Sequence, residues 1–300
     1  MRAKALVGRC PGADGARQIA RGPTLDDALQ RLATTPYARH TRTAADLRHA
    51  QRAVSATLLW HLRVLAGWLP RSGARLLVPL AAGFEIANVA SRLPAAGVRH
   101  AQAAQPYRLG ALETAWRHLE PARTPAETRA ALAASPWGDP GGDTPWALIT
   151  GMRMAAARRT ALAVQPARRW ARGRAALLAA RELFVHHRSL PEPVLHDAAR
   201  LLGRRATAAA TYQEFCERLP SSAAWALHDI GEPGELWRAE ARWWRTVDAD
   251  GAALVREGRY GPRVVVGAVA RLSVDAWRVR AALESAARGG RPGDVFDAVV

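Results

Sequence analysis

The sequence GFEIANVASRL, residues 83–93, places three polar side chains within an apolar stretch. Glu85, Asn88 and Arg92 follow one another at spacings of three and four residues, so a helix carries them on one face. We therefore predict a helix here, with a carboxylate, an amide and a guanidinium along one stripe. These three residues are candidate site residues.

The rest of the chain also predicts helices. Leucines recur at helical spacing between residues 58 and 69, and residues 171–188 are rich in Ala and Leu. The only β-branched run, RVVVGAV (263–269), continues directly into a helical pattern. Loops are short and marked by Gly and Pro. The sequence therefore predicts an all-α chain without a long linker.

Residues 235–248, ELWRAEARWWRTVD, place Trp237 and Trp244 on one helical stripe and three arginines on another. Such a helix usually packs its tryptophans into the core and exposes its arginines, which is the interpretation that we favour. In the alternative interpretation, the arginines lie on anionic lipid headgroups.

One pattern occurs twice, at an offset of 100 residues. TLDDALQRLATTPYA begins at Thr24 and TPAETRAALAASPWG begins at Thr124. In both, an acid follows the threonine by three residues, which has the form of a capping box. Both helices then end in a small residue, a proline and an aromatic residue. This recurrence indicates an internal duplication.

The stretch around Glu85 also has a counterpart near the end of the sequence. SVDAWRVRAAL (273–283) aligns with it at an offset of 190 and pairs Glu85 with Asp275. Asp275 and Arg278 therefore join the candidate site residues. A third, weaker copy lies in residues 180–188, where one glutamate and the helical period support it.

The chain is strongly basic, with 43 Lys and Arg against 26 Asp and Glu and a net charge of +17. Such a charge favours nucleic acid, anionic lipid headgroups or acidic proteins as partners. The arginines are scattered through every segment and form no terminal arm. Nucleic-acid binding is therefore not the favoured hypothesis.

Common catalytic motifs are missing from the sequence. A P-loop needs a lysine after its glycine-rich turn, and the only lysine is Lys4. Neither G-x-S-x-G nor H-E-x-x-H occurs. His186 and His187 are adjacent, so on a helix they point in different directions and cannot share one metal ion. We predict no catalytic residue, no cofactor and no metal site.

Cysteines and hydropathy indicate a cytoplasmic protein. Cys10 and Cys216 are far apart and lack CxxC spacing, which is typical of a reduced protein. No secretory signal pattern opens the sequence. A membrane span needs about 20 apolar residues, and the best stretches, 54–69 and 76–90, are interrupted by charged residues or proline. Any membrane contact is predicted to be peripheral.

The order of these patterns resembles the C subunit of the V-type (V/A-type) rotary ATPases, which is called d in the eukaryotic enzyme. A capped helix ending in L-A-x-[TS]-P-[YW] comes first, and F-[DE]-I-x-N-x-x-x-x-L follows long helices. A glycine–proline lead then opens a last helix with an acid three residues before a polar position. The resemblance begins at about residue 15 and is firmest at residues 24–37, 83–93, 124–139 and 260–300.

The resemblance implies an all-α, funnel-shaped protein of three pseudo-symmetric units. It implies one domain over residues 1–300, with internal units at about 1–105, 106–195 and 196–300. It further implies a non-catalytic central-stalk (rotor) subunit without cofactors, which couples the shaft subunits D and F to the membrane proteolipid ring during ATP-driven or ATP-synthesising ion (proton) transport. The protein would then lie peripherally on the cytoplasmic face of the membrane.

Within such a family, the candidate residues would face neighbouring repeats or the funnel lumen. Carboxylate and guanidinium groups there exchange charge-assisted hydrogen bonds and fix the angle between units, a role that we favour over direct shaft contact. In the alternative, they are ordinary polar residues with exposed tips. The candidate residues are Glu85, Asn88, Arg92, Asp275 and Arg278.

The sequence departs from the family pattern at both ends. The last helix of the family usually carries Lys-x-x-Glu and then Asn, whereas this sequence has Leu272, Asp275 and Arg278 in those places. The amino-terminal helix is shortened and interrupted by Gly12 and Gly15.

Two alternatives to a rotor subunit stay open. One is an Arg-rich helical nucleic-acid-binding protein, which needs a continuous basic groove and an affinity that falls steeply with salt. The other is a diverged family member that keeps the fold without the coupling role. A rotor subunit instead predicts basic charge spread around its outside.

Overall fold

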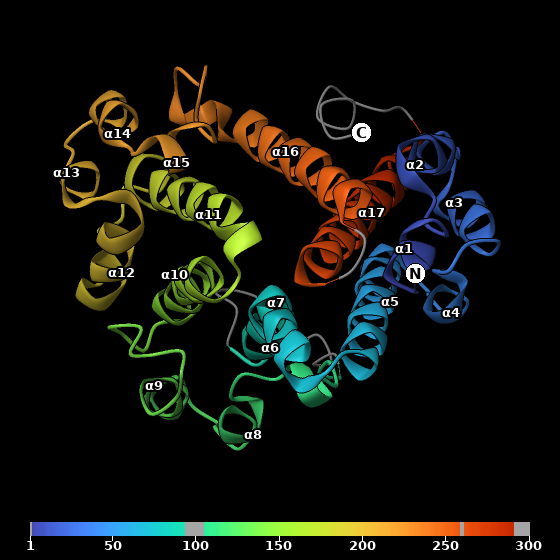
Figure 1. The fold of residues 1–300 in the computed structure, drawn as a ribbon, viewed down its shortest axis with the longest axis horizontal. Coiled ribbons are helices and arrows are strands. Elements are labelled where there is room, and N and C mark those ends of the chain that lie inside the picture. The colour runs from blue at the N-terminus through green and yellow to red at the C-terminus, as the bar shows by residue number, and fades with distance from the viewer. Residues whose placement is uncertain (1, 94–104, 259–260, 291–300) are drawn as a thin grey trace. The chain divides into compact units, whose positions relative to one another are not determined.

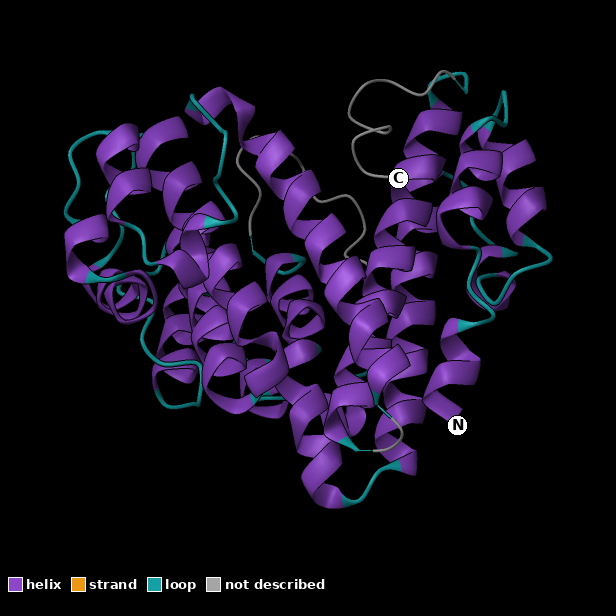
Figure 2. Ribbon diagram, turned by 45° about the horizontal axis from the view of Figure 1, so that its top comes forward, coloured by secondary structure: helices purple, strands orange, loops and turns teal. Residues whose placement is uncertain are grey.

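The computed structural model describes residues 2–93, 105–258 and 261–290, and every regular element in these ranges is helical (Figures 1 and 2). The all-α prediction is therefore confirmed. The chain forms two compact units, Met1–Gly73 with Ala241–Val300 and Ala74–Glu240. Both ends of the chain therefore pack into one unit.

The first unit joins the amino-terminal helices to the last helix. Its helices are α1 (Arg2–Val7), α2 (Gly12–Ala20), α3 (Leu25–Leu32), α4 (Ala38–Thr41), α5 (Leu47–Trp68), α17 (Pro262–Ala287) and most of α16 (Leu236–Glu257). The long helix α17 contacts α1, α2, α3 and α5 (Figure 1). Ile19, Leu32, Val54, Val279 and Leu283 are buried in the shared core. Burial of these apolar side chains stabilises the unit.

The second unit is a continuous stretch of chain around α10. Its helices are α6 (Arg71–Leu80), which starts just before the boundary, α7 (Ala82–Ala90), α8 (Trp116–Leu119), α9 (Pro125–Ala133), α10 (Pro145–Ala163), α11 (Arg168–Ala180), α12 (Glu192–Leu202), α13 (Arg204–Thr207), α14 (Tyr212–Arg218) and α15 (Ser221–Ala224). A π-helical turn, Arg181–Val185, extends α11. Short 3-10 turns are Gly110–Leu112, Gln165–Ala167 and Pro233–Glu235. Helix α10 packs against α7, α11 and α12.

The two predicted threonine caps are present, one in each unit. The Thr24 side chain accepts a hydrogen bond from the Asp27 backbone N–H and begins α3. Thr124 begins α9 in the same way, and Glu127 completes a full capping box with it. The aromatic residue that ends each copy of the pattern is buried. The duplicated sequence therefore forms the same local structure twice.

Predictions for the two ends of the chain were partly correct. The predicted interruption is present at residues 8–11, between α1 and α2, and Gly12, with φ 68°, is the first residue of α2. The interruption predicted at Gly15 is wrong, because Gly15 lies inside α2. Residues 263–269 are helical within α17, which confirms the predicted continuation of this β-branched run.

The two tryptophans that were predicted to pack into the core, Trp237 and Trp244, differ in burial, and Trp244 is half-buried. Trp244 stacks on Trp277, with ring centroids 4.9 Å apart. Trp237 is not in the core but 36% exposed. The Arg238 guanidinium lies 5.3 Å from the centre of the Trp237 ring and shields part of its apolar surface, so this side chain is partly covered without core packing.

Two glycines allow α16 and α17 to approach closely. A Cβ atom at Gly267 would lie 2.7 Å from the Gly251 carbonyl oxygen and 2.8 Å from the Leu254 Cβ. We expect Gly267→Ala to lower the free energy of unfolding by about 1–3 kcal/mol through overpacking, although alanine favours helices. Urea unfolding measures this. The control is Gly67→Ala in α5, where no atom lies within 4 Å of the new Cβ and a gain of about 0.5–1 kcal/mol is expected. A higher free energy of unfolding in both variants would contradict the close contact between α16 and α17 at Gly267.

In the part of the chain that the structure describes, no single helix is long and apolar enough to cross a membrane. The pair α6 and α7, bent by 44°, passes the same test of length and composition when taken together. However, the α7 half of this pair carries a buried glutamate and a buried asparagine that the fold itself uses.

Candidate functional site

Glu85 lies in α7 with 1% of its surface exposed, and the chain surrounds its carboxylate with donors. Its Oε2 accepts a hydrogen bond from the Thr114 backbone N–H at 2.6 Å. Its Oε1 accepts one from the Ala115 N–H at 2.9 Å and another from Trp137 Nε1 at 2.6 Å. These charge-assisted bonds offset the cost of burying the charge.

The other two polar residues of the stripe bind the same neighbouring segment. Asn88 donates from Nδ2 to the Tyr107 carbonyl at 2.9 Å and accepts from the Tyr107 N–H at 2.6 Å. Arg92, two residues beyond the end of α7, donates to the Glu120 carbonyl at 2.6 Å. Glu85, Asn88 and Arg92 therefore each hydrogen-bond α7 or its end to residues 107–120. These bonds explain why an apolar helix carries a polar stripe.

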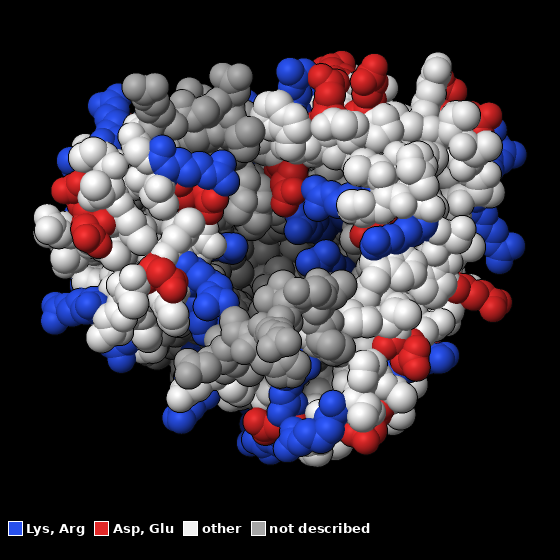
Figure 3. All heavy atoms as spheres, turned by 180° about the vertical axis from the view of Figure 1, so that it is seen from behind, with Lys and Arg blue, Asp and Glu red and all other residues white. Residues whose placement is uncertain are grey.

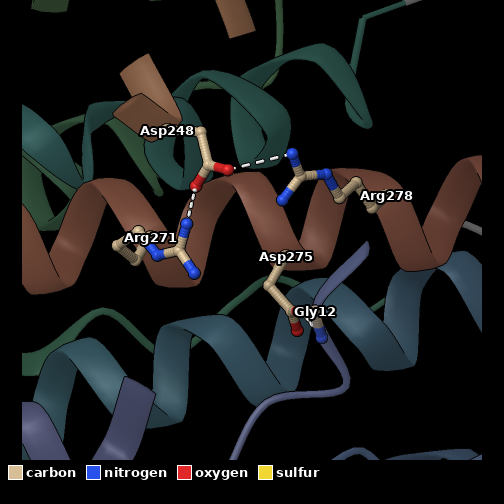
Figure 4. Close-up of polar contacts among 5 residues, drawn as sticks. All are labelled: Gly12, Asp248, Arg271, Asp275 and Arg278. Atoms are coloured by element: carbon tan, nitrogen blue, oxygen red, sulfur yellow. Dashed lines mark hydrogen bonds and ion pairs between the residues drawn. The ribbon is translucent and has the colours of Figure 1, made fainter. Parts of the chain in front are cut away.

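Asp275 lies in α17 with 3% of its surface exposed and is held in a similar way. Its Oδ1 accepts a hydrogen bond from the Gly12 backbone N–H at 2.7 Å, and Figure 4 shows the carboxylate turned toward this residue. Its Oδ2 accepts from the Tyr37 hydroxyl at 2.7 Å. Burial raises the pKa of Asp275 above its ordinary value, and the bonds from Tyr37 and Gly12 partly oppose this shift.

The two carboxylates occupy equivalent positions in their units, and we call each a carboxylate joint. Each accepts from backbone N–H at or just before the start of a helix, α8 for Glu85 and α2 for Asp275. Each also accepts from the aromatic residue that ends the threonine-capped pattern, Trp137 or Tyr37. Glu85 and Asp275, which are paired at an offset of 190 residues, therefore bind Trp137 and Tyr37, which are paired at an offset of 100 residues.

Arg278 does not share a hydrogen bond with Asp275 but pairs with a residue of α16. Its Nη2 donates to Asp248 Oδ2 at 2.9 Å, and the Arg271 Nη1 donates to the other oxygen at 2.5 Å (Figure 4). Only 9% of the Arg278 side chain is exposed. Asp248 therefore holds two arginines of α17 against α16.

The weak third copy also contains a buried acid. Glu182, in the π-helical turn after α11, is 4% exposed and accepts a hydrogen bond from Trp146 Nε1 at 2.6 Å. Thr211 caps α14 as Thr24 and Thr124 cap their helices. However, Trp146 lies at the start of α10, not after α14, so the donor differs from those of the two carboxylate joints.

Sequence reasoning missed the partners of the candidate residues. Tyr37 and Trp137 were recognised as helix stops but not as donors, although both carry a polar hydrogen that needs an acceptor when buried. Asp248 was missed entirely. The spacing of seven between Arg271 and Arg278 was the available signal, because it places two cations on one face of the last helix.

The chemistry of these sites is structural, because each carboxylate oxygen of the two joints already accepts a hydrogen bond. Burial raises the pKa of the neighbouring Cys10 thiol, so this group stays protonated at neutral pH. Within residues 2–93, 105–258 and 261–290, no group of three His, Cys, Asp or Glu side chains could hold a metal ion.

A groove of about 430 Å³ lies beside α10 and α12 in the second unit. Its lining includes Trp137, Glu192 and His196, together with the ion pair between Arg158 and Asp197, whose Nε and Oδ2 atoms are 2.8 Å apart. Its lining contains both acidic and basic side chains. This mixture of charges favours no particular class of ligand.

The face drawn in Figure 3 carries Lys and Arg side chains as well as Asp and Glu side chains. A nucleic-acid track requires a continuous basic surface. This mixture of charges by itself favours neither the rotor interpretation nor the nucleic-acid alternative.

Removal of the Tyr37 hydroxyl tests the joint at Asp275. We expect Tyr37→Phe to lower the free energy of unfolding by about 1–3 kcal/mol at about pH 7. The lost bond raises the pKa of Asp275 further above its value in the unfolded chain. Because the bond from Tyr37 favours the ionised form of Asp275, the loss of stability in Tyr37→Phe becomes smaller as the pH falls and Asp275 becomes protonated. Urea unfolding of both proteins at about pH 7 and about pH 4.5 measures this, and a deficit that grows in acid would contradict it.

Comparison with known proteins adds no family to this description. No protein-family model matches the sequence, and no curated protein matches it. The functional inference therefore rests on the residues and contacts of this chain.

Proposed function

We propose that this chain is a non-catalytic rotor subunit of a V/A-type rotary ATPase, equivalent to the C subunit of those enzymes. In this role it couples the D–F shaft to the membrane proteolipid ring during ion transport and lies peripherally on the cytoplasmic face of the membrane. The order of sequence motifs led to this proposal. The recurrence of the carboxylate joint supports it most directly, because Glu85 and Asp275 have matching partners.

A coupling subunit has to transmit torque without yielding between its helices. Buried, charge-assisted hydrogen bonds to backbone groups restrict the relative motion of the elements that they join. Glu85 joins α7 to the start of α8, and Asp275 joins α17 to the start of α2. Such joints suit a rigid mechanical part, whereas an enzyme leaves its reactive groups open to substrate.

The proposal includes three repeated units around a funnel. The caps of the long helices support it: Asp46 begins α5 and Thr144 begins α10 with equivalent side-chain bonds. Each of these long helices is followed by a buried glutamate: Glu85 in α7 comes after α5, and Glu182 in the π-helical turn comes after α10 and α11. The third unit would then consist of α14, α16 and α17, with Asp275 as its acid.

A binding assay with purified shaft subunits tests this function. The full chain, treated with nuclease, is mixed with a purified D–F pair at physiological salt and run on a size-exclusion column. We expect a one-to-one complex that elutes ahead of either component. Absence of a complex, together with salt-sensitive retention of nucleic acid by the chain, would reject the rotor role and favour the nucleic-acid alternative.

A further inference from the structure

The carboxyl-terminal end of α5 carries an exposed tryptophan, with exposed arginines near it in the sequence and one in contact with it. Trp68, the last residue of α5, is 44% exposed, and the Arg2 guanidinium from α1 lies 5.1 Å from the centre of its ring. Arg63 lies on α5 five residues before Trp68, and Arg71 is the first residue of α6; both are exposed. We call these four residues the α5 tip.

None of the three helices that supply the α5 tip, α1, α5 and α6, contains an acidic residue. The segment Arg2–Val7 has none, and no Asp or Glu occurs between Asp46 and Glu85. The local charge contributed by these helices is therefore entirely positive. A positive surface of this kind attracts the anionic headgroups of a cytoplasmic leaflet.

The other exposed tryptophan has different surroundings. Arg238 lies over Trp237 much as Arg2 lies over Trp68, but Arg238 also pairs with Glu235 at 2.5 Å. Helix α16 itself contains four acidic residues within its sequence LWRAEARWWRTVDADGAALVRE. The positive charge around Trp237 is thus largely balanced. The structure favours the α5 tip over residues 235–248 as the surface for lipid headgroups.

The aromatic geometry favours lipid over single-stranded nucleic acid. Base binding needs open aromatic faces on which bases stack. On α5, Arg2 lies over Trp68, and Arg39 lies over Trp60 at 4.5 Å from its ring centre. These guanidinium groups occupy ring faces. A partly exposed tryptophan beside arginines instead suits the boundary between headgroups and acyl chains, where its indole is half in water.

We propose that the α5 tip docks on an anionic lipid bilayer, with Trp68 and Arg2 at the level of the headgroups and with Arg63 and Arg71 adding positive charge at the same end of the helix. This inference specifies the membrane contact of the proposed function and rests on it for the cytoplasmic location. The charge and exposure of the tip stand independently of any rotary partner.

Flotation with lipid vesicles tests the proposal on the full, nuclease-treated chain. We expect binding to vesicles of phosphatidylcholine with phosphatidylserine, little binding to phosphatidylcholine alone, and loss of binding as salt rises. The variant Trp68→Ala with Arg63→Glu should bind at least about tenfold more weakly, because it removes the aromatic anchor and reverses one charge. Circular dichroism confirms that these surface changes leave the fold intact.

A matched control makes the same change at the other exposed tryptophan. Trp237→Ala with Arg238→Glu removes one tryptophan and reverses one arginine on α16, and we expect wild-type affinity for the vesicles. The proposal is overturned if phosphatidylserine does not increase binding of the wild-type chain to vesicles, or if both variants lose affinity for the vesicles equally. It is also overturned if an oligonucleotide displaces the vesicles and its own binding is lost in the Trp68 variant.

The vesicle assay contains neither shaft subunit, so its result is separate from the test of the rotor role. If the chain does not bind vesicles but forms a complex with the D–F pair, only the proposed lipid contact is rejected. If the chain binds vesicles but forms no complex with the D–F pair, only the rotor role is rejected.

Discussion

Glu85→Ala is expected to lower the free energy of unfolding by about 3–5 kcal/mol. The substitution leaves the backbone N–H groups of Thr114 and Ala115 and the indole N–H of Trp137 without their acceptor. Because the joint is almost fully buried, water cannot replace the lost carboxylate without opening the packing. The smaller side chain also leaves a cavity beneath α8, which adds to the loss.

Urea unfolding of the purified chain measures this effect, and Glu85→Gln provides a control of the same shape. Glutamine keeps one acceptor oxygen but turns an NH2 group toward a donor, so an intermediate loss of about 2 kcal/mol is expected. A double-mutant cycle with Trp137→Phe then isolates the side-chain bond. Losses below about 1 kcal/mol for Glu85→Ala would show that the joint contributes little.

Asp248→Ala is the second substitution with a large expected effect, a loss of about 3–4 kcal/mol. Asp248 accepts hydrogen bonds from both Arg271 and Arg278. Arg271 is partly exposed and can turn to water, but the Arg278 side chain is only 9% exposed. Removal of Asp248 therefore leaves a buried guanidinium without its carboxylate.

A double substitution separates the lost ion pair from simple lost packing. Asp248→Leu with Arg278→Met removes both charges and fills a similar volume, so we expect it to recover most of the stability lost in Asp248→Ala. Thermal and urea unfolding of the wild type, Asp248→Ala, the double variant and its two single variants, Asp248→Leu and Arg278→Met, give the comparison. If the double variant is as unstable as the sum of its single changes, the buried charge is not the cause of the loss.

The sequence predicted those features of the fold that depend on neighbouring residues. The spacing of Glu85, Asn88 and Arg92 located a helix face, and Thr24 and Thr124 located two helix starts, because side-chain periodicity and capping act within one or two turns. Arg92 falls just past the end of α7, within the usual uncertainty of helix ends.

The partners of the candidate residues were not predictable from local patterns. Asp275 binds Gly12 and Tyr37, which lie more than two hundred residues away in the sequence. Only the packing of α17 against the amino-terminal helices brings them together, and no periodicity records that contact. Trp237 shows the opposite case, in which a local pattern indicated burial but a neighbouring arginine covered the ring at the surface.

The first unit is assembled from both ends of the chain, and this affects how the protein folds during synthesis. Residues 74–240 form a compact unit from one continuous segment, so this part has all its partners soon after it leaves the ribosome. The amino-terminal helices emerge earlier but must wait for α17, whose Asp275 completes the bonds to Gly12 and Tyr37. During translation, the apolar faces of these helices therefore stay exposed for a longer time than the rest of the chain. We expect a chaperone to bind the nascent chain there.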